Sequence, residues 1–141
     1  MGFSIEHVAV RCRDMDASIE FYCRMFDAEI MFRRKMEGGK EITYISIGDT
    51  MLELMLMDPA SEPVDALEHY GVHHIGIKVD DFKTVYAELK EKGAVFLGEP
   101  FSPNKGFQLV FLQDPNGAVI EIACRDPEIM QESIRKGVVN W

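Results

Sequence analysis

Residues 5–11 of the chain read IEHVAVR, and residues 72–78 read VHHIGIK. Both stretches alternate their side chains and are rich in Val and Ile, which predicts a β-strand in each. Each is followed by an amphipathic segment and later by a short apolar run that contains one carboxylate. Those runs are MLEL at residues 51–54 and VIEI at residues 119–122. The chain therefore contains two copies of one module.

A histidine and a glutamate occupy matching places in the two copies. His7 precedes Glu53 by 46 residues, and His74 precedes Glu121 by 47. Because strand side chains alternate between faces, we expect each of these residues to point away from the helix-covered side of its strand. An unpaired carboxylate inside an apolar strand is costly, and a bound metal ion would offset that cost. The pattern predicts a metal site made of two histidines and two glutamates.

The order of elements is predicted to be β-α-β-β-β in both copies, which gives the fold class α+β. In the first copy we expect a helix capped by Asp14 or Asp16, and strands near 4–12, 28–34, 41–47 and 50–57. In the second we expect a helix over 82–92 capped by Asp80 or Asp81, and strands near 72–79, 94–97, 107–113 and 118–124. Turns are expected at Gly38-Gly39, Gly48-Asp49 and 114–117, and a last helix is expected over 127–137.

The length suits one domain of 141 residues. Its parts are module one at 3–58, a linker at 59–70, module two at 71–126 and a C-terminal helix at 127–141. A lone module of this size would have a weak core. We therefore expect the modules to pair, either within one chain or between two chains, and two modules per chain favour a homodimer.

The formal net charge of −9 argues against nucleic acid, since proteins that bind it need a basic surface. An anionic ligand would need local basic side chains. The available ones are Arg11, Arg33, Arg34, Lys35, Lys78 and Lys105, of which residues 33–35 are interpreted as solvated surface. The chain has no apolar run that could span a bilayer and no signal-peptide pattern, and its three cysteines lack metal-motif spacing. We therefore expect a cytoplasmic protein with no membrane partner.

The ligand set limits the choice of metal ion. Two imidazoles and two carboxylates suit Ni²⁺ and Zn²⁺, with Co²⁺, Mn²⁺ and Fe²⁺ as alternatives, and they do not suit Cu⁺. If coordination positions remain open to water or substrate, the site is catalytic. His73 is expected to point opposite to His74, and His69 lies in the linker, so neither is counted as a ligand.

At these residues the chain resembles the vicinal oxygen chelate superfamily, which includes glyoxalase I, methylmalonyl-CoA epimerase, extradiol dioxygenases and resistance proteins for fosfomycin or bleomycin. The resemblance covers roughly residues 3–126. Its most specific pieces are EHVAV at 6–10, LEL at 52–54, HIGIKVDD at 74–81, and DPNG at 114–117 ahead of IEI at 120–122. It implies paired βαβββ modules, a cupped mixed sheet, a divalent metal ion, and substrates that chelate the metal through adjacent oxygens.

Within the superfamily the ligand order is most like glyoxalase I, which uses His, Glu, His and Glu, here His7, Glu53, His74 and Glu121. That resemblance implies a site formed between two subunits. The implied reaction converts the hemithioacetal of a 2-oxoaldehyde and a thiol, such as methylglyoxal and glutathione, to a 2-hydroxyacyl thioester. The metal would stabilise an enediolate. Glu121 would move the proton between adjacent carbons, and Glu53 could share that work on the opposite face.

The substrate pocket resembles glyoxalase I only in part. Arg11 stands four residues after His7, where that family has an arginine that holds a glutathione carboxylate. Met57 stands four residues after Glu53, where the family has an asparagine. Met57 is read either as an apolar wall of the pocket or as core and dimer packing, and Lys105 is a further candidate contact for an anionic substrate. A thiol other than glutathione stays open.

Three other functions remain as alternatives. An acyl-CoA epimerase related to methylmalonyl-CoA epimerase is suggested by residues 67–75, although the 114–117 turn is more like glyoxalases and dioxygenases. An extradiol dioxygenase would use only three ligands on Fe²⁺ and would leave Glu53 without a role. A non-catalytic resistance protein would typically lack the complete ligand set.

Overall fold

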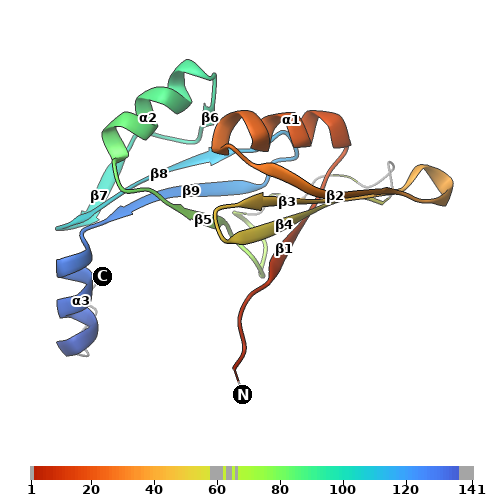
Figure 1. The fold of residues 1–141 in the computed structure, drawn as a ribbon. Coiled ribbons are helices and arrows are strands. Elements are labelled where there is room, and N and C mark those ends of the chain that lie inside the picture. Colours follow the sequence, from red (N-terminus) through yellow and green to blue (C-terminus); the bar gives the residue numbers. More distant parts are fainter. Residues whose placement is uncertain (1, 58–61, 63–64, 66, 137–141) are drawn as a thin grey trace. The chain divides into compact units, whose positions relative to one another are not determined.

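The computed structural model describes residues 2–57, 62, 65 and 67–136 (Figure 1). The chain divides into two compact units. The first comprises residues 1–65 together with 114–118, and the second comprises residues 66–113 and 119–141. The division falls within the expected linker at 59–70, most of which lies outside the described residues, as does the end of the expected C-terminal helix beyond residue 136.

The first unit has the predicted β-α-β-β-β order. Its elements are β1 (His7–Arg11), α1 (Met15–Phe26), β2 (Glu29–Lys35), a 3₁₀ turn η1 (Glu37–Gly39), β3 (Glu41–Ile47) and β4 (Thr50–Leu56). The strands form a mixed sheet in the order β1-β4-β3-β2, in which β1 runs parallel to β4 and the other pairs are antiparallel. A parallel pair needs a crossover connection, and α1 supplies part of it.

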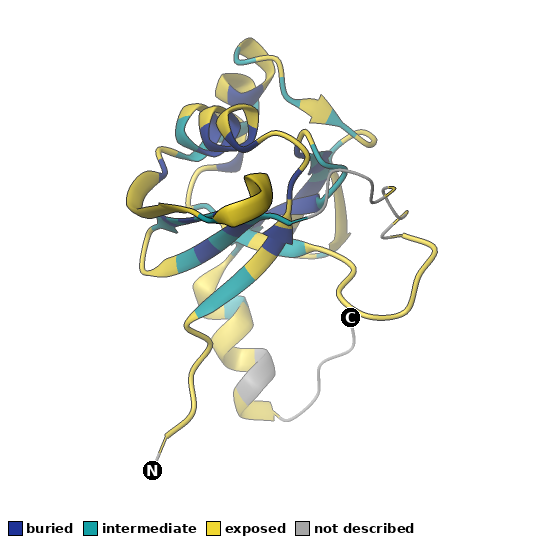
Figure 2. Cartoon of the chain, turned by 90° about the vertical axis from the view of Figure 1, so that its right-hand side faces the viewer, coloured by how far each residue is buried: buried dark blue, intermediate teal, exposed yellow. Residues whose placement is uncertain are grey.

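Helix α1 packs against one face of this sheet. Asp14 caps its N-terminus, since the Asp14 side chain accepts a hydrogen bond from the Ala17 amide at 2.9 Å. The buried side of the helix carries Ile19, Phe21, Tyr22 and Met25, while Phe26 is half-buried. Helix α1 contacts β3 and β4, where Ile45, Leu52 and Leu54 are at most 4% exposed. Buried and exposed positions consequently alternate around the helix in Figure 2.

The second unit repeats this plan with one strand more. Its elements are β5 (Ile75–Lys78), α2 (Phe82–Glu91), β6 (Val95–Phe96), β7 (Phe101–Asn104), β8 (Phe107–Gln113), β9 (Val119–Arg125) and α3 (Pro127–Lys136). The strand order is β5-β9-β8-β6, with β7 also paired to β8, and β5 runs parallel to β9. Asp81 caps α2, and Gly93, at φ +80°, follows its C-terminus. Helix α3 leaves the end of β9 on the side of the sheet opposite α2 (Figure 1).

Strand β7 was not predicted, and it explains how the two copies differ. β6 pairs with the C-terminal end of β8 and β7 with its N-terminal half, so both lie along the same edge. In the first unit that edge is the single strand β2, with an irregularity between Ile30 and Phe32. Gly98 and Pro100 stand between β6 and β7, and both residue types disfavour a continuous ladder. The expected edge strand is therefore divided in two.

A buried carboxylate holds the turn at residues 114–118 to the first unit. Asp114 is 6% exposed, and its oxygens accept hydrogen bonds from the Tyr22 hydroxyl at 2.9 Å and from the amides of Asn116 and Ala118 at 2.8 Å each. The Asn116 side-chain amide donates to the Ser18 hydroxyl at 3.1 Å and accepts from the Arg13 amide at 3.0 Å. The predicted turn is confirmed, and it is anchored to α1.

Arg33 corrects the interpretation of residues 33–35 as plain solvated surface. Its guanidinium pairs with the buried carboxylate of Glu41 and, at 2.8 Å, with Asp16 on α1. A carboxylate as buried as that of Glu41 would be costly without such a partner. Arg33 thus links α1 to β2 and β3, and it is not available for an anionic ligand.

The helices of the described residues are short. None of them is long and apolar enough to cross a membrane.

We predict that the Asp114 cluster contributes strongly to stability. Asp114→Ala leaves the Tyr22 hydroxyl and two amides without an acceptor, so the free energy of unfolding should fall by roughly 3 kcal/mol, whereas Tyr22→Phe should cost about 1.5 kcal/mol. Urea denaturation followed by circular dichroism measures both. Asp27→Ala, an exposed change just after α1, cannot serve as the control because Asp27 adopts φ +52°. Glu20→Ala, on the exposed face of α1, serves as the control. If Asp114→Ala lowers the free energy of unfolding no more than Glu20→Ala does, the prediction is contradicted.

Candidate functional site

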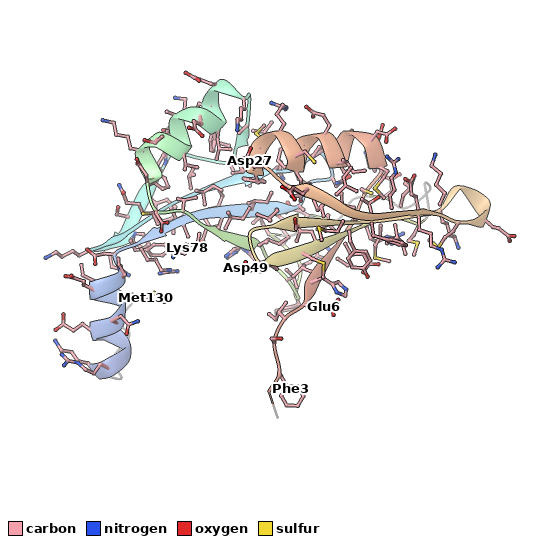
Figure 3. The ribbon with its side chains drawn as sticks, viewed as in Figure 1. Phe3, Glu6, Asp27, Asp49, Lys78 and Met130 are labelled. Atoms are coloured by element: carbon pink, nitrogen blue, oxygen red, sulfur yellow. The ribbon has the colours of Figure 1, made fainter. Side chains whose placement is uncertain are left out.

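The first unit brings His7 and Glu53 together. Parallel pairing of β1 and β4 places Ala9 opposite Glu53, so the imidazole two residues earlier reaches the carboxylate from the neighbouring strand. The Nε2 atom of His7 lies 3.2 Å from an Oε2 atom of Glu53. The other ring nitrogen, Nδ1, lies 3.1 Å from the carboxylate of Glu6, which precedes β1 in Figure 3. The ring edge also contacts Tyr44, with the centroids 5.4 Å apart.

The second unit repeats this arrangement with His74 and Glu121. Gly76 pairs with Glu121 as Ala9 pairs with Glu53, and the Nε2 atom of His74 lies 3.1 Å from an Oε2 atom of Glu121. The ring of His74 meets Phe111 edge-on, again with a centroid distance of 5.4 Å. Phe111 pairs with Glu121 across the β8–β9 ladder, just as Tyr44 pairs with Glu53 across β3–β4. The two pairs are therefore equivalent in sequence, register and contact.

The distances within each pair fit two ligands of one metal ion. Ligand atoms held at about 2.1 Å from a metal lie roughly 3.0 Å apart at a right angle and roughly 3.4 Å apart at a tetrahedral angle. The observed separations of 3.2 and 3.1 Å fall between these limits. The same distance suits a hydrogen bond from a protonated imidazole, so each pair can also persist without a metal. In neither unit does the described part of the chain gather three or more His, Cys, Asp or Glu side chains around one point.

Both pairs are similarly accessible from solvent. The histidine side chains are 33% and 34% exposed, and the glutamate side chains are 13% and 11% exposed. Each carboxylate is thus largely shielded from water while the imidazole beside it is open. A shielded carboxylate next to an accessible nitrogen suits a group that exchanges protons with a small ligand.

The position of His73 corrects the sequence prediction. Strand alternation predicted that the His73 side chain points to the face opposite His74. However, β5 begins only at Ile75, so both histidines precede the strand and the alternation rule does not apply to them. Their Nδ1 atoms lie 2.8 Å apart, and both rings meet Phe111 edge-on. His73 therefore belongs to the surroundings of the second pair.

The contacts of Glu6, Tyr44 and Phe111 with the two histidines were not predicted from the sequence. A signal for Tyr44 was present: a tight turn at Gly48-Asp49 makes Ile47 face Thr50, and counting outward along the hairpin brings Tyr44 opposite Glu53. No comparable rule applies to Glu6 or His73, because their contacts depend on rotamers outside regular strands.

The three expected substrate contacts lie at the ends of strands. Arg11 closes β1, two positions beyond Ala9 on the face that His7 uses, and it is exposed. Met57 follows β4 and is half-buried. Lys105 lies exposed in the turn between β7 and β8 of the second unit. Arg11 and Met57 thus belong to the first unit with His7, and Lys105 belongs to the second with His74.

Comparison with known proteins agrees with this architecture. Residues 4–122 match the model of the Glyoxalase/Bleomycin resistance protein/Dioxygenase superfamily. The chain belongs to this superfamily. The resemblance seen in the sequence is thereby confirmed, and the matched segment contains all four residues of the two His–Glu pairs.

Individual relatives of this superfamily member carry different activities in their names. An ethylmalonyl-CoA/methylmalonyl-CoA epimerase of Cereibacter sphaeroides is 30% identical, covering 84% of this chain and 95% of its own. A "Probable lactoylglutathione lyase" of Vibrio cholerae is 28% identical, covering 84% and 88%. Among solved structures, the trypanothione-dependent glyoxalase I of Leishmania major is 25% identical, covers 96% of this chain and 95% of that one, and superposes with a TM-score of 0.73.

Loss of one histidine tests whether the pairs bind metal. His74→Ala removes one of four expected ligands and should lower the metal content of protein reloaded with Ni²⁺ or Zn²⁺ at least tenfold, measured by inductively coupled plasma mass spectrometry after gel filtration. His69→Ala changes an exposed histidine outside both pairs and serves as the matched control. Equal metal content in the two variants would exclude His74 as a ligand.

Proposed function

We propose that this protein is a divalent-metal-dependent enzyme of the glyoxalase I type, which converts a 2-oxoaldehyde–thiol hemithioacetal to a 2-hydroxyacyl thioester. The observation that supports this most is the duplicated His–Glu pair, with separations of 3.2 and 3.1 Å in the two units. Members of the superfamily typically bind a divalent metal ion. Four ligands in the order His, Glu, His, Glu are the set that the glyoxalase I resemblance implies.

His7, Glu53, His74 and Glu121 would hold the metal, with Ni²⁺ or Zn²⁺ favoured and Co²⁺, Mn²⁺ or Fe²⁺ as alternatives. When bound, the metal supplies Lewis-acid stabilisation of negative charge that develops on a substrate oxygen. Each module contributes one pair, so completing the set requires two modules. We propose that a homodimer provides them, with one module of each chain at every site.

Glu121 would act as the base that moves a proton between the two adjacent carbons of the substrate. Its side chain is 11% exposed and its described polar side-chain contact is with His74, so a proton could pass between the carboxylate and a ligand at the open imidazole edge. Glu53 has the equivalent position and could act on the opposite face of the substrate.

The substrate would be recognised at the strand ends. The Arg11 guanidinium has the planar donor geometry that a carboxylate of an anionic thiol needs. Met57 would provide an apolar wall. Lys105 is the expected second cationic contact. With a net charge of −9 the protein gives an anionic substrate no long-range attraction, so these local cations would carry the recognition.

An acyl-CoA epimerase is the second candidate. The relative from Cereibacter sphaeroides, at 30% identity and with nearly its whole length covered, favours it. The chemistry is closely related, since an epimerase also moves a proton next to a carbonyl and can use two carboxylates on opposite faces. The duplicated pairs suit both reactions, and the identity of the thiol carrier separates them.

Metal reconstitution with two substrates tests the proposal. The chelated protein would be reloaded with Ni²⁺, Zn²⁺ or Co²⁺ and assayed with methylglyoxal plus glutathione by thioester absorbance, and with methylmalonyl-CoA by deuterium uptake from D₂O. Metal-dependent thioester formation supports the glyoxalase reaction. Metal-dependent exchange on the acyl-CoA alone would establish the epimerase instead. Failure to bind any metal would overturn both.

Replacing the proposed base should separate binding from turnover. Glu121→Gln keeps the shape but cannot accept a proton, so kcat should fall at least a thousandfold while substrate binding stays measurable by calorimetry. Glu88→Gln, on an exposed position of α2, is the control. A Glu121→Gln variant with unimpaired kcat would move the base role to Glu53.

Arg11→Ala should raise KM for an anionic thiol substrate about tenfold or more with a smaller change in kcat, because the lost contact lies away from the reacting carbons. Steady-state kinetics with the hemithioacetal measures both constants. Arg34→Ala, an exposed change on β2, is the matched control. A KM equal to that of the control would remove Arg11 from the pocket.

A further inference from the structure

The two His–Glu pairs are equivalent in register but differ in the side chains that support them. In each unit, one residue directly before the histidine contacts its Nδ1 atom, and one aromatic residue on the adjacent antiparallel strand faces the glutamate. In the first unit these supporting residues are Glu6 and Tyr44. In the second they are His73 and Phe111. A duplicated site with different support in its halves need not hold its ligands equally.

The aromatic position gives the larger difference. Tyr44 and Phe111 both stand opposite the glutamate in the ladder, and both meet the neighbouring histidine edge-on at 5.4 Å. The Tyr44 hydroxyl is hydrogen-bonded to the Glu53 carboxylate that it faces across the β3–β4 ladder. Phe111 has no hydroxyl, so its side chain can contact Glu121 but cannot donate a hydrogen bond to it. Among the described residues, Glu53 therefore faces a hydroxyl donor at the ladder position where Glu121 faces only a phenyl ring.

The histidine supports differ in the same direction. His7 has a carboxylate on Nδ1, which can accept the Nδ1 proton and leave Nε2 free as a ligand. At the equivalent position, the Nδ1 atom of His74 lies 2.8 Å from the Nδ1 atom of His73. A neutral imidazole can accept the His74 Nδ1 proton at that atom only in the tautomer that carries its own proton on Nε2. Glu6 is 71% exposed, so solvent weakens its contribution, and Tyr44 is the stronger of the two supports.

Burial does not account for a difference between the halves. The two histidines differ in exposure by one percentage point, and the two glutamates differ by two. The ligand spacings differ by 0.1 Å. The supporting contacts are therefore what sets the halves apart.

From these contacts we propose that the two halves of the metal site are unequal: Tyr44 and Glu6 make His7 and Glu53 the tightly held half, and His74 and Glu121 form the loosely held half. This inference rests on the proposed metal site but not on the substrate. Tyr44 acts as a positioning residue, because its hydroxyl restricts Glu53 to the orientation that faces His7. Glu121, without such a donor, keeps the rotational freedom that a carboxylate needs to exchange a proton.

Exchanging one hydroxyl between equivalent positions tests this. Tyr44→Phe and Phe111→Tyr each alter one oxygen atom and keep the ring. Tyr44→Phe should weaken Co²⁺ affinity about tenfold, measured by competition with a chromophoric chelator, since outer contacts of a metal ligand typically matter by about 10–100-fold. Phe111→Tyr should leave the affinity unchanged or tighten it. The visible spectrum of the Co²⁺ protein should change in Tyr44→Phe if the Glu53 ligand is reoriented.

The controls separate positioning from folding. Tyr86→Phe removes a hydroxyl on α2, where the Tyr86 ring contacts Phe82 and Phe96, and should change neither affinity nor spectrum. The thermal midpoint of the metal-free Tyr44→Phe protein should match that of Tyr86→Phe. Co²⁺ affinity in Tyr44→Phe within threefold of wild type would overturn the inference and leave the proposed function intact. A wild-type protein that binds no Co²⁺, Ni²⁺ or Zn²⁺ would overturn both.

A second matched pair probes the histidine supports. Glu6→Gln and His73→Gln place the same amide against Nδ1 in both halves. Glu6→Gln should weaken Co²⁺ binding more than His73→Gln, because only the first change removes a charged acceptor. The opposite order would overturn the assignment of His7 to the tightly held half.

Discussion

Parallel pairing of the first and last strands of each module is the constraint on which the site depends. A parallel ladder fixes which residue of one strand faces which residue of the other, and the same register recurs: Ala9 opposite Glu53 and Gly76 opposite Glu121. The histidine two residues upstream then always reaches the glutamate. Because a one-residue slip would turn every side chain to the other face, the buried helix-facing residues protect this register.

The buried cluster around Asp114 ties a turn of the second sequence repeat to the first structural unit. Its acceptors satisfy the Tyr22 hydroxyl and two turn amides in an environment where unpaired groups would be expensive. This contact lies on the turn that leads into β9, the strand that carries Glu121. A turn identified in the sequence for its conformation thus has a second role in tertiary packing.

The duplicated architecture explains why one superfamily can host related reactions. In this chain two equivalent modules provide two imidazoles and two carboxylates, and function depends on the side chains placed around such a site and not on the fold alone. The immediate surroundings of the two His–Glu pairs differ, since Tyr44 and Phe111 occupy equivalent positions with and without a hydroxyl. The two units thus share the histidine and the glutamate and differ in the residues that contact them.

The sequence by itself determined the α+β class, the order of elements apart from β7, and the matching places of His and Glu in the two modules. It narrowed each helix cap to two aspartates, of which the structure selects Asp14 and Asp81. Those features follow from local periodicity, turn residues and the spacing of two repeats. Only the tertiary structure decided that Arg33 pairs with a buried glutamate and that the 114–118 turn joins the first unit. It also decided which side chains support each histidine. These contacts join residues far apart in sequence or outside regular strands, where no periodic rule specifies which atoms will meet.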